Sequence, residues 1–443
     1  MTYEQTIEHL YSQLPMFSRI GAAAYKKDLH NTIQLCDAID NPQKKFKSIH
    51  IAGTNGKGST ANMLAAILQE AGYKTGLYTS PHIKDFRERI RINGEMVEKD
   101  FIVDFVERTK KLTEDIQPSF FELTVAMAFE YFAKEKVDIA VIERGLRGRL
   151  DSTNIISPIL SVITNIGYDH VALLGNTLPE IAFEKAGIIK KNTPVVIGEI
   201  LPETLPVFTK KANEENADIH VASKEFTVEY IDSSGSLLLC NVRNVATNIV
   251  EKLRLDLTGL YQTKNICTVL SAVEVLKQLG ISILETNLHH ALENVSVISG
   301  IRGRWEVIET KPALILDVAH NEDGIKQILE QLRYSYPNSN FHFVLGFVSD
   351  KDVSKVLSLF PPAAKYYFTN AHIPRALPAA ELKKIASEYL LDGNSFENVN
   401  DAVKEAKTNA MAHDVIMVCG SFFIIAEIEK DQINLLELKN SNP

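Results

Sequence analysis

Residues 46–72 read FKSIHIAGTNGKGSTANMLAAILQEAG, and this stretch decides the fold class. It begins with an apolar run typical of a buried strand, continues with a glycine-rich segment, and ends with apolar residues at helical spacing. Gly72 stands where such a helix would end. The following KTGLYTS, residues 74–80, predicts a second strand. Strand, glycine-rich turn, helix and strand in this order predict one βαβ unit.

The glycine-rich turn carries the strongest chemical signal in the chain. Glycines allow backbone N–H groups to face a phosphate, and the helix N-terminus adds a favourable dipole. Lys57 would neutralise the β- and γ-phosphates, and Ser59 or Thr60 could reach a phosphate or a Mg²⁺ ion. The alternative is a strand-to-helix turn without a ligand. The residues of this P-loop are Gly53, Thr54, Asn55, Gly56, Lys57, Gly58, Ser59 and Thr60.

Strands and helices alternate beyond this unit. Helices are predicted at 99–116, 119–135, 178–187, 261–279 and 283–293, and strands at 137–143, 159–166 and 194–198. Ser119 with Glu122 three residues later forms a capping-box pattern for the second helix. Within 218–257 the short alternating segments EFTVEYI and SLLLCNV predict a small antiparallel β subregion. The fold class is therefore α/β, with a P-loop-containing, doubly wound parallel sheet.

A second domain is expected after residues 294–303, NVSVISGIRG, which we interpret as a linker. Strands are predicted near 304–309, 313–318, 341–346, 365–369 and 413–418. They alternate with helices, which is the pattern of a Rossmann-like α/β domain. We therefore expect an N-terminal domain over residues 1–296 and a C-terminal domain over residues 297–443.

Composition excludes several classes of protein. The 443 residues include 47 Lys and Arg against 56 Asp and Glu, a formal charge of −9, whereas a nucleic-acid binder would carry a basic footprint. The four cysteines form no CxxC pair, so neither a zinc ribbon nor a disulfide framework is indicated. We see no signal peptide and no run of 18 apolar residues. These features favour a cytoplasmic protein with neither nucleic-acid nor membrane partners.

Polar residues follow three of the predicted strands. Ser80, Glu143 and His170 each stand near the carboxyl end of a strand, where open α/β sheets bind ligands. A carboxylate beside a phosphate loop is a natural Mg²⁺ ligand, and histidine is a common metal ligand. Each residue also has an ordinary explanation. Ser80 precedes a proline in a turn, and the other two could simply face water.

Two further segments are ambiguous in the same way. Lys185 lies on a predicted helix, where a lysine is usually solvated. Asp317, His320 and Asn321 follow a strand of the second domain. The aspartate could bind a ribose hydroxyl or a phosphate-linked metal. Asn321 could instead cap the helix that follows it.

Taken together, these segments resemble the bifunctional folylpolyglutamate synthase/dihydrofolate synthase family of the Mur ligase superfamily, whose members form amide bonds with ATP. The matching segments occur in the family's order and span about residues 46–428. They are IHIAGTNGKGST, GLYTSPHIKDFRERIRING, SFFELTVAMAF, GRLDSTNII, ITNIGYDHVALLGNTLPEIAFEKAGIIK, GLYQTKN, GRWEVI, ILDVAHN, SDKD, PRALP and CGSFFI.

The resemblance implies a role for each matching residue. The P-loop would bind the phosphates of ATP, and Ser80, Glu143 and His170 would bind Mg²⁺, with two ions expected. Lys185 matches a lysine that the family carries as a carbamate, and His320 would lie close to the γ-phosphate. The further nucleotide contacts would be Asn265, Arg304 and Asp317. The folate-side residues would be Phe121, Glu122, Asp151, Ser152, Thr153 and Asn154.

The implied reaction joins glutamate to a folate, or to dihydropteroate. ATP would phosphorylate the substrate carboxylate, and the glutamate amine would attack the resulting acyl phosphate to give an amide, ADP and phosphate. The ATP would lie between the two domains of a monomer. One segment departs from the family pattern: Arg144 replaces an apolar residue, and Arg147 replaces a glycine. These arginines leave two alternatives open, a related ligase for another carboxylate and a catalytically silent nucleotide- or folate-binding paralogue.

Overall fold

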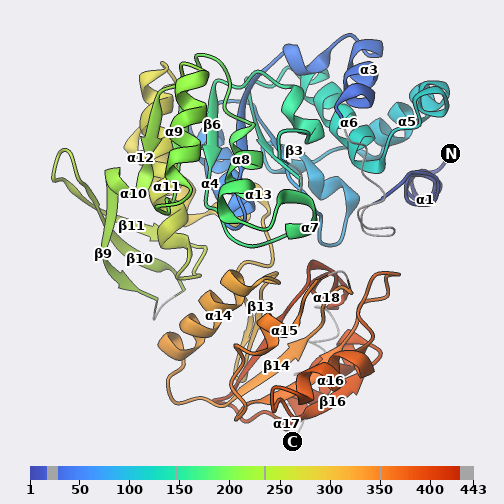
Figure 1. The fold of residues 1–443 in the computed structure, drawn as a ribbon, viewed down its shortest axis with the longest axis vertical. Coiled ribbons are helices and arrows are strands. Elements are labelled where there is room, and N and C mark those ends of the chain that lie inside the picture. The colour runs from blue at the N-terminus through green and yellow to red at the C-terminus, as the bar shows by residue number, and fades with distance from the viewer. Residues whose placement is uncertain (17–27, 146–147, 234–235, 350, 430–443) are drawn as a thin grey trace, which may run out of the picture. The chain divides into compact units, whose positions relative to one another are not determined.

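The structure is a computed structural model that describes residues 1–16, 28–145, 148–233, 236–349 and 351–429 (Figure 1). The chain divides into two compact units, Met1–Arg302 and Gly303–Pro443. The boundary between the units falls inside the predicted linker 294–303. Most of that segment is nevertheless helix α13 (Val295–Ser299), whose two end residues are buried. Val295 and Ile298 of this helix pack on the core of the first unit, whereas Val297 is exposed. Within the described ranges, no helix has the length and apolar character needed to cross a membrane.

The first unit is built on one eight-stranded sheet. Its strand order is β4-β3-β2-β5-β1-β6-β7-β8. The six strands β2, β5, β1, β6, β7 and β8 are parallel, and β3 and β4 form an antiparallel edge next to β2. The strands are β1 (Lys47–Ala52), β2 (Thr75–Tyr78), β3 (Ile90–Ile92), β4 (Glu95–Met96), β5 (Ile139–Glu143), β6 (Leu160–Ile163), β7 (Val195–Ile197) and β8 (Ile219–Val221). The predicted parallel sheet is confirmed, and short strands that the sequence analysis did not identify extend it at both edges.

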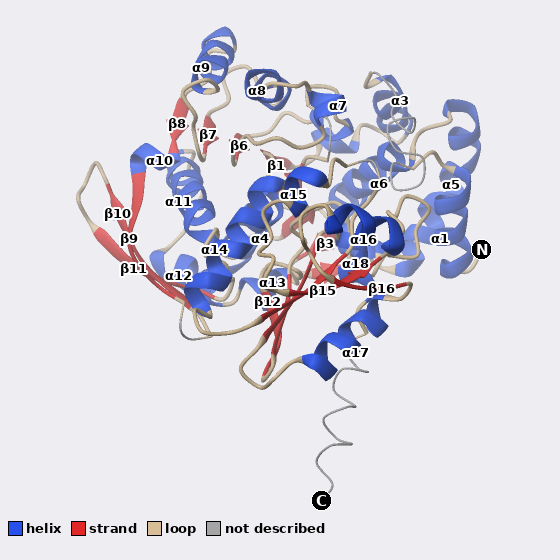
Figure 2. Cartoon of the chain, turned by 60° about the horizontal axis from the view of Figure 1, so that its bottom comes forward, coloured by secondary structure: helices blue, strands red, loops and turns tan. Residues whose placement is uncertain are grey.

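Helices cover both faces of this sheet. They are α1 (Tyr3–Gln13), α3 (His30–Ala38), α4 (Lys57–Glu70), α5 (Lys99–Ile116), α6 (Phe120–Lys134), α7 (Val171–Leu174), α8 (Leu178–Ala186), α9 (Leu205–Glu214), α10 (Ala222–Glu225), α11 (Gln262–Gln278) and α12 (Glu285–Glu293), with 3-10 helices η2 (Pro42–Lys44), η3 (Phe86–Arg89) and η4 (Ser152–Ile155). Ile49 and Ile51 of β1 pack with α4, α11 and α12 on one face. Figure 2 shows these three helices next to one another. The opposite face of the sheet carries α5, α6, α8 and α9.

Local sequence signals explain where the helices begin and end. Helix α4 starts at Lys57 after Gly56, whose φ of 80° is the left-handed conformation that glycine adopts at little cost. Gly72, with φ of 89°, follows the end of the same helix as predicted. Ser119 and Glu122 form the predicted capping box of α6. Helix α5 has the predicted bounds.

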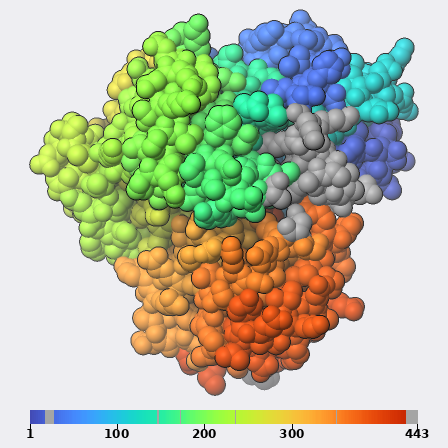
Figure 3. Space-filling model, viewed as in Figure 1, coloured from blue at the N-terminus to red at the C-terminus, as the bar shows by residue number. Residues whose placement is uncertain are grey.

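A small antiparallel sheet completes the first unit, as the alternating segments predicted. Its order is β11-β10-β9, formed by β9 (Phe226–Asp232), β10 (Leu238–Asn244) and β11 (Val250–Leu255). One face of this sheet packs on α11 through Leu238, Cys240 and Val242, which are buried. In the space-filling view its yellow-green surface forms a lobe at the side of the unit (Figure 3).

The second unit is a separate α/β layer structure with its own core. Its sheet order is β12-β13-β17-β14-β15-β16, parallel apart from the antiparallel edge strand β12. The strands are β12 (Glu306–Thr310), β13 (Ala313–Leu316), β14 (Phe341–Leu345), β15 (Lys365–Thr369), β16 (Gly393–Phe396) and β17 (Val415–Cys419). The helices are α14 (Glu322–Ser335), α15 (Ser354–Leu357), α16 (Ala379–Ser387), α17 (Val399–Asn409) and α18 (Phe422–Glu427). The second α/β fold is confirmed.

Candidate active site

The strand order of the first unit places the predicted site residues along one edge of its sheet. Strands β2, β5, β1 and β6 are consecutive and parallel, so their carboxyl ends share this edge. Ser80 follows β2, Glu143 ends β5, the P-loop follows β1, and His170 comes after β6. Ligands of open α/β sheets bind beyond this kind of edge. The fold therefore brings together segments that are far apart in the sequence.

Hydrogen bonds from the segment after β6 fix the shape of the P-loop. The Thr54 N–H donates to the Asn165 carbonyl at 3.0 Å, and the Asn55 N–H donates to the Asn165 side-chain oxygen at 2.8 Å. The Thr164 hydroxyl donates to the Asn55 carbonyl at 2.6 Å. Lys57 folds back over the loop, with its Nζ 3.0 Å from the Thr54 carbonyl. The loop is thus pre-organised, which lowers the entropy cost of holding a phosphate.

The start of helix α11 braces the other side of the P-loop. The Gln262 side-chain amide donates to Ser59 Oγ at 3.2 Å, and Asn265 donates to Gln262 Oε1 at 2.7 Å. A Cβ on Gly56 would lie 2.2 Å from Asn265 Oδ1, so only glycine fits there. Thr60 Oγ1 is buried and has no hydrogen-bond partner within the described residues. The sequence analysis did not assign a role to Gln262 or Asn165, although both lie in quoted motifs.

Two of the predicted metal ligands, Ser80 and Glu143, supply the oxygen donors that suit a hard cation, and His170 adds a nitrogen donor. Glu143 is buried at the end of β5, and His170 precedes α7 with its Nε2 3.7 Å from Asp169 Oδ2. Among the residues described, no group of three His, Cys, Asp or Glu side chains is gathered tightly enough to form a metal site alone. Ser80 contributes a hydroxyl, and nucleotide phosphates would add further oxygens. This donor set fits Mg²⁺, which takes few protein ligands beside substrate phosphates.

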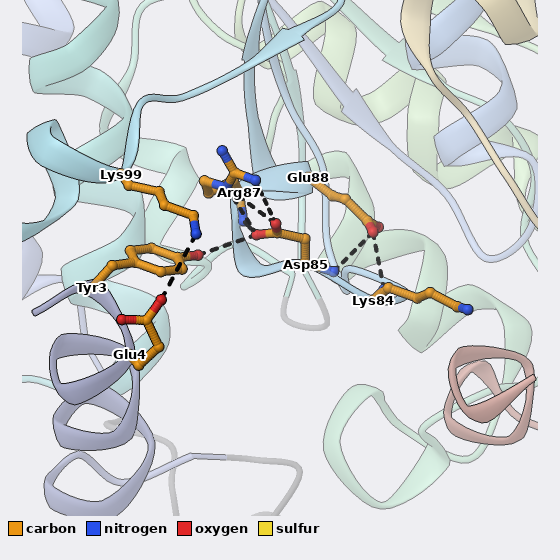
Figure 4. Close-up of polar contacts among 7 residues, drawn as sticks. All are labelled: Tyr3, Glu4, Lys84, Asp85, Arg87, Glu88 and Lys99. Carbon is orange, nitrogen blue, oxygen red and sulfur yellow. Dashed lines mark hydrogen bonds and ion pairs between the residues drawn. The ribbon is translucent and has the colours of Figure 1, made fainter. Parts of the chain in front are cut away.

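The loop after Ser80 is held by carboxylates that accept backbone N–H groups (Figure 4). Glu88 accepts from the N–H groups of Ile83, Lys84 and Asp85 at 2.7 to 2.9 Å. Asp85 in turn binds the Arg87 guanidinium, with its Oδ2 2.7 Å from Nη2, and accepts from the Tyr3 hydroxyl at 3.1 Å. Burial alone would raise the pKa of Asp85, but these hydrogen bonds outweigh it and hold the pKa below its usual value. The segment leading from Ser80 is therefore anchored to α1.

His82 in this loop makes folding stability depend on pH. Burial, reinforced by the positive charge of Arg89, lowers the pKa of His82 to about 3. An unfolded histidine has a pKa of about 6.5, so below that pH the unfolded chain binds a proton that the folded chain refuses. Stability should therefore fall as the pH drops from about 6.5 towards 3, by up to about 1.4 kcal/mol per unit for this one group.

Between pH 7 and pH 5 the free energy of unfolding of the native chain should fall. In His82→Gln we expect this fall to be smaller by up to about 2 kcal/mol. Urea denaturation followed by circular dichroism at the two pH values measures this difference. His413→Gln is the control, because that side chain is already exposed. Equal losses in the native chain and in His82→Gln would contradict the assignment.

Lys185 is buried, contrary to the usual behaviour of a lysine on a helix. Lys185 is 4% exposed, and its Nζ donates to the Gly53 carbonyl of the P-loop at 2.7 Å. Burial, followed by the nearby charges of Arg144 and Lys57, lowers the pKa of its amine well below the ordinary value. The alternative of a solvated lysine is wrong, and the side chain belongs to the sheet edge that carries the P-loop.

The predicted folate-side residues have structural partners within the first unit. The Glu122 carboxylate accepts from the Ser119 N–H at 2.6 Å, and Asp151 caps η4 by accepting from Thr153. Asn154 donates to the Arg149 and Gly187 carbonyls, at 2.8 and 3.0 Å. Ser152 and Thr153 are buried, and Phe121 is half-buried. Contact of these residues with a substrate stays a prediction.

The two unexpected arginines are Arg144 and Arg147. Arg147 lies outside the described residues. Arg144 is fully buried after β5, where its backbone N–H donates to the Ile51 carbonyl at 2.8 Å. Burial lowers the pKa of its guanidinium to about 10. At neutral pH it therefore remains a buried cation.

The second unit gathers its candidate residues at the carboxyl ends of β13 and β17. The Asp317 carboxylate accepts from the Trp305 and Ala319 N–H groups, both at 2.8 Å. The Asn321 side chain accepts from the Gly324 N–H at 2.8 Å, so this residue caps α14, which was the alternative prediction. His320 Nδ1 lies 2.8 Å from the Val318 carbonyl, which makes Nδ1 the protonated nitrogen.

Arg304 lies beside an aromatic ring of the same unit. Its guanidinium carbon is 5.2 Å from the centre of the Phe422 ring, and the His320 ring is 5.8 Å from that ring on centroids. Phe422 begins α18 directly after β17. Arg304 and His320 therefore both contact the Phe422 ring, although Arg304 precedes β12 and His320 follows β13.

Both units match domains of one class of enzyme. Residues 51–273 match the Mur ligase middle domain, and residues 303–422 match the Mur ligase glutamate ligase domain. The fold and the phosphate-binding edge thus define a Mur-type ligase.

Individual relatives narrow this class. The chain is 34% identical to the dihydrofolate synthase/folylpolyglutamate synthase of Bacillus subtilis over 91% of this chain and 95% of the relative. The folylpolyglutamate synthase of Mycobacterium tuberculosis, solved with ADP and AMPPCP, is 28% identical and superposes with a TM-score of 0.85, covering 100% of this chain and 99% of that one. The bifunctional enzyme of Yersinia pestis, solved with AMPPNP and a Mn ion, is 27% identical with a TM-score of 0.82, covering 99% and 98%. The chain belongs to the folylpolyglutamate synthase/dihydrofolate synthase family.

Proposed function

We propose that this protein ligates L-glutamate to the carboxylate of folates, using ATP and passing through an acyl phosphate. The observation that carries the proposal is the single sheet edge that holds the P-loop, Glu143 and the buried Lys185. Relatives of this family solved with ATP analogues support a nucleotide at this edge. Dihydropteroate is a second acceptor of the same chemistry, and the bifunctional name of the Bacillus relative supports its inclusion.

Residues of this chain would reduce the electrostatic repulsion between the two anionic groups that react. The transferred phosphoryl group and the substrate carboxylate are both anions, and they must approach each other. The P-loop N–H groups, the N-terminus of α4 and Lys57 would bind the phosphates and offset their charge. The braces from Asn165 and Gln262 keep these donors in place, so little reorganisation is needed when the charge moves.

Ser80, Glu143 and His170 would hold Mg²⁺, with two ions expected in all. The metal would supply further charge neutralisation for the phosphates. Lys185 would join this site as a carbamate, because an anionic oxygen ligand is compatible with a cation and an ammonium group is not. Its burial favours the neutral amine from which a carbamate forms.

The second unit would complete the nucleotide site. Arg304 and Asp317 would contact the nucleotide, and His320 would lie close to the γ-phosphate, while Asn265 would contact the nucleotide from the first unit. Closure of two domains around ATP excludes water from the acyl phosphate. We propose a monomer, located in the cytoplasm. The four free thiols support the location, because thiols stay reduced in that compartment.

Radiolabelled glutamate incorporation tests the function. Purified full-length protein is incubated with ATP, Mg²⁺ and labelled glutamate, together with tetrahydrofolate, dihydropteroate or no acceptor. We expect incorporation and ADP release with tetrahydrofolate and none without an acceptor. Tight ATP binding without turnover on either acceptor would contradict the proposal and favour a silent nucleotide-binding paralogue.

We expect Arg304→Ala to weaken ATP binding by about tenfold, because a charged contact to phosphate or base is lost. Isothermal titration with a non-hydrolysable ATP analogue measures the change. The thermal unfolding of the first unit should not move, because the substitution lies on the second. Arg333→Ala, an exposed arginine at the end of α14, is the matched control. Unchanged affinity in Arg304→Ala would remove this residue from the nucleotide site.

A further inference from the structure

Arg144 is a buried arginine with unsatisfied donors. Its side chain is 0% exposed, and its Nε and Nη2 have no hydrogen-bond partner among the residues that the structure describes. Its Nη1 makes only a long contact of 3.5 Å to the Glu184 carbonyl. Buried guanidinium N–H groups without acceptors are strongly disfavoured, so Nε and Nη2 call for an acceptor that the side chains of the described residues do not supply.

Arg144 lies against helix α8. Glu184, which Arg144 contacts, immediately precedes Lys185 in this helix. The Arg144 N–H donates to the Ile51 carbonyl at 2.8 Å, and the Lys185 amine donates at 2.7 Å to the carbonyl of Gly53, two residues further along the chain. Two buried basic side chains thus share one region, which is unfavourable while both are cations.

Asp151 does not resolve this conflict. Its carboxylate makes no hydrogen bond to Nε or Nη2 of Arg144, and its Oδ1 accepts from the Thr153 N–H and hydroxyl, at 3.1 and 2.6 Å. His50 faces the same Thr153, with its Nε2 2.9 Å from the hydroxyl, and its Nδ1 is buried without a partner in the described chain. The polar groups around Arg144 therefore remain incompletely paired.

We propose that Arg144 binds a carbamate formed on Lys185, with Nε and Nη2 donating to the carbamate oxygens. The guanidinium edge offers two parallel N–H groups, which match the two oxygens of a planar carboxylate-like anion. Arg144 is then a positioning residue that orients and retains the modified side chain. This inference rests on the carbamylation included in the proposed function.

Carbamylation of Lys185 needs CO₂ as its only co-reactant and releases one proton. The lone pair of the neutral Lys185 Nζ attacks the carbon of CO₂, and an N–C bond forms. One C–O π bond breaks, and its electron pair stays on oxygen. The proton leaves Nζ for water or the bicarbonate buffer. A neutral amine becomes an anion beside Arg144, so the guanidinium gains an attractive partner of opposite charge.

Carbon-13 NMR of the full-length protein in labelled bicarbonate tests the proposal without nucleotide or Mg²⁺. The native chain should show a carbamate resonance that is absent from Lys185→Gln. In Arg144→Val, the bicarbonate concentration needed for half occupancy should rise by about tenfold. Arg144→Lys should fall between the two, because an ammonium group keeps the charge and loses the paired N–H geometry. Arg149→Ala, an exposed arginine of the same segment, is the control and should match the native chain.

Valine is chosen because the family pattern has an apolar residue at this position, so the fold should tolerate it. If Arg144→Val does not fold, Arg144→Met and Arg144→Lys provide the comparison. Equal carbamate occupancy in the native chain and in the folded Arg144 variants would overturn the proposal, and water or an inorganic anion would then be the partner. A native chain without the resonance would overturn it too. Neither result decides whether glutamate is ligated, because incorporation is measured separately.

Discussion

Lys185→Ala should lose most ligase activity, by at least about 100-fold in kcat, which corresponds to about 2.7 kcal/mol of transition-state stabilisation. The Nζ of Lys185 lies 2.7 Å from the P-loop carbonyl of Gly53, so the side chain reaches the phosphate-binding edge itself. As a carbamate it would add an anionic ligand next to Glu143. Lys185→Arg should be no more active, because a guanidinium does not form this carbamate. Steady-state glutamate incorporation measures both variants.

Rescue separates this role from a structural one. Acetate or another short carboxylic acid should partly restore Lys185→Ala, because the anion can fill the space that the side chain leaves. Lys191→Ala, an exposed lysine soon after α8, should keep native activity with or without acetate. Full activity of Lys185→Arg would show that no carbamate is needed.

Gly53→Ala should abolish nucleotide binding and ligation together, with activity reduced by at least about 100-fold, or about 2.7 kcal/mol. A Cβ at this position would lie 1.8 Å from Thr164 Oγ1, and the φ of 151° is rare for other residues. The collision would displace either the loop or the hydroxyl that donates to the Asn55 carbonyl at 2.6 Å. Strain of this kind also costs stability, about 1–3 kcal/mol.

Gly72→Ala is the matched control for this prediction. Its φ of 89° is also positive, but nothing lies within 4 Å of an added Cβ. The variant should lose about 1 kcal/mol of stability through its backbone and keep native activity. Isothermal titration with an ATP analogue and thermal denaturation of both variants provide the measurements. Native nucleotide affinity in Gly53→Ala would mean that the loop adapts and that its observed shape is not required.

Local patterns predicted the elements well because their signals are short in range. Gly56 and Lys57 mark the start of α4, and Ser119 with Glu122 marks the start of α6. Capping, turn geometry and hydrophobic period act within a few residues, so one stretch of sequence contains them. The segment 294–303 shows the limit of such signals. It looks like a linker by composition, but α13 forms there because Val295 is buried against the first unit.

The sequence by itself determined the α/β class, the phosphate loop and the family resemblance, whereas the tertiary structure decided how the site is assembled. Lys185 and Gly53 are 132 residues apart, and Gln262 and Ser59 are 203 apart, yet each pair is hydrogen-bonded. The first contact forms at the sheet edge where the loop after β1 begins, and the second forms because α11 packs on α4. The unpaired state of Arg144 is also a property of packing, since burial depends on every element around a side chain and on no local pattern.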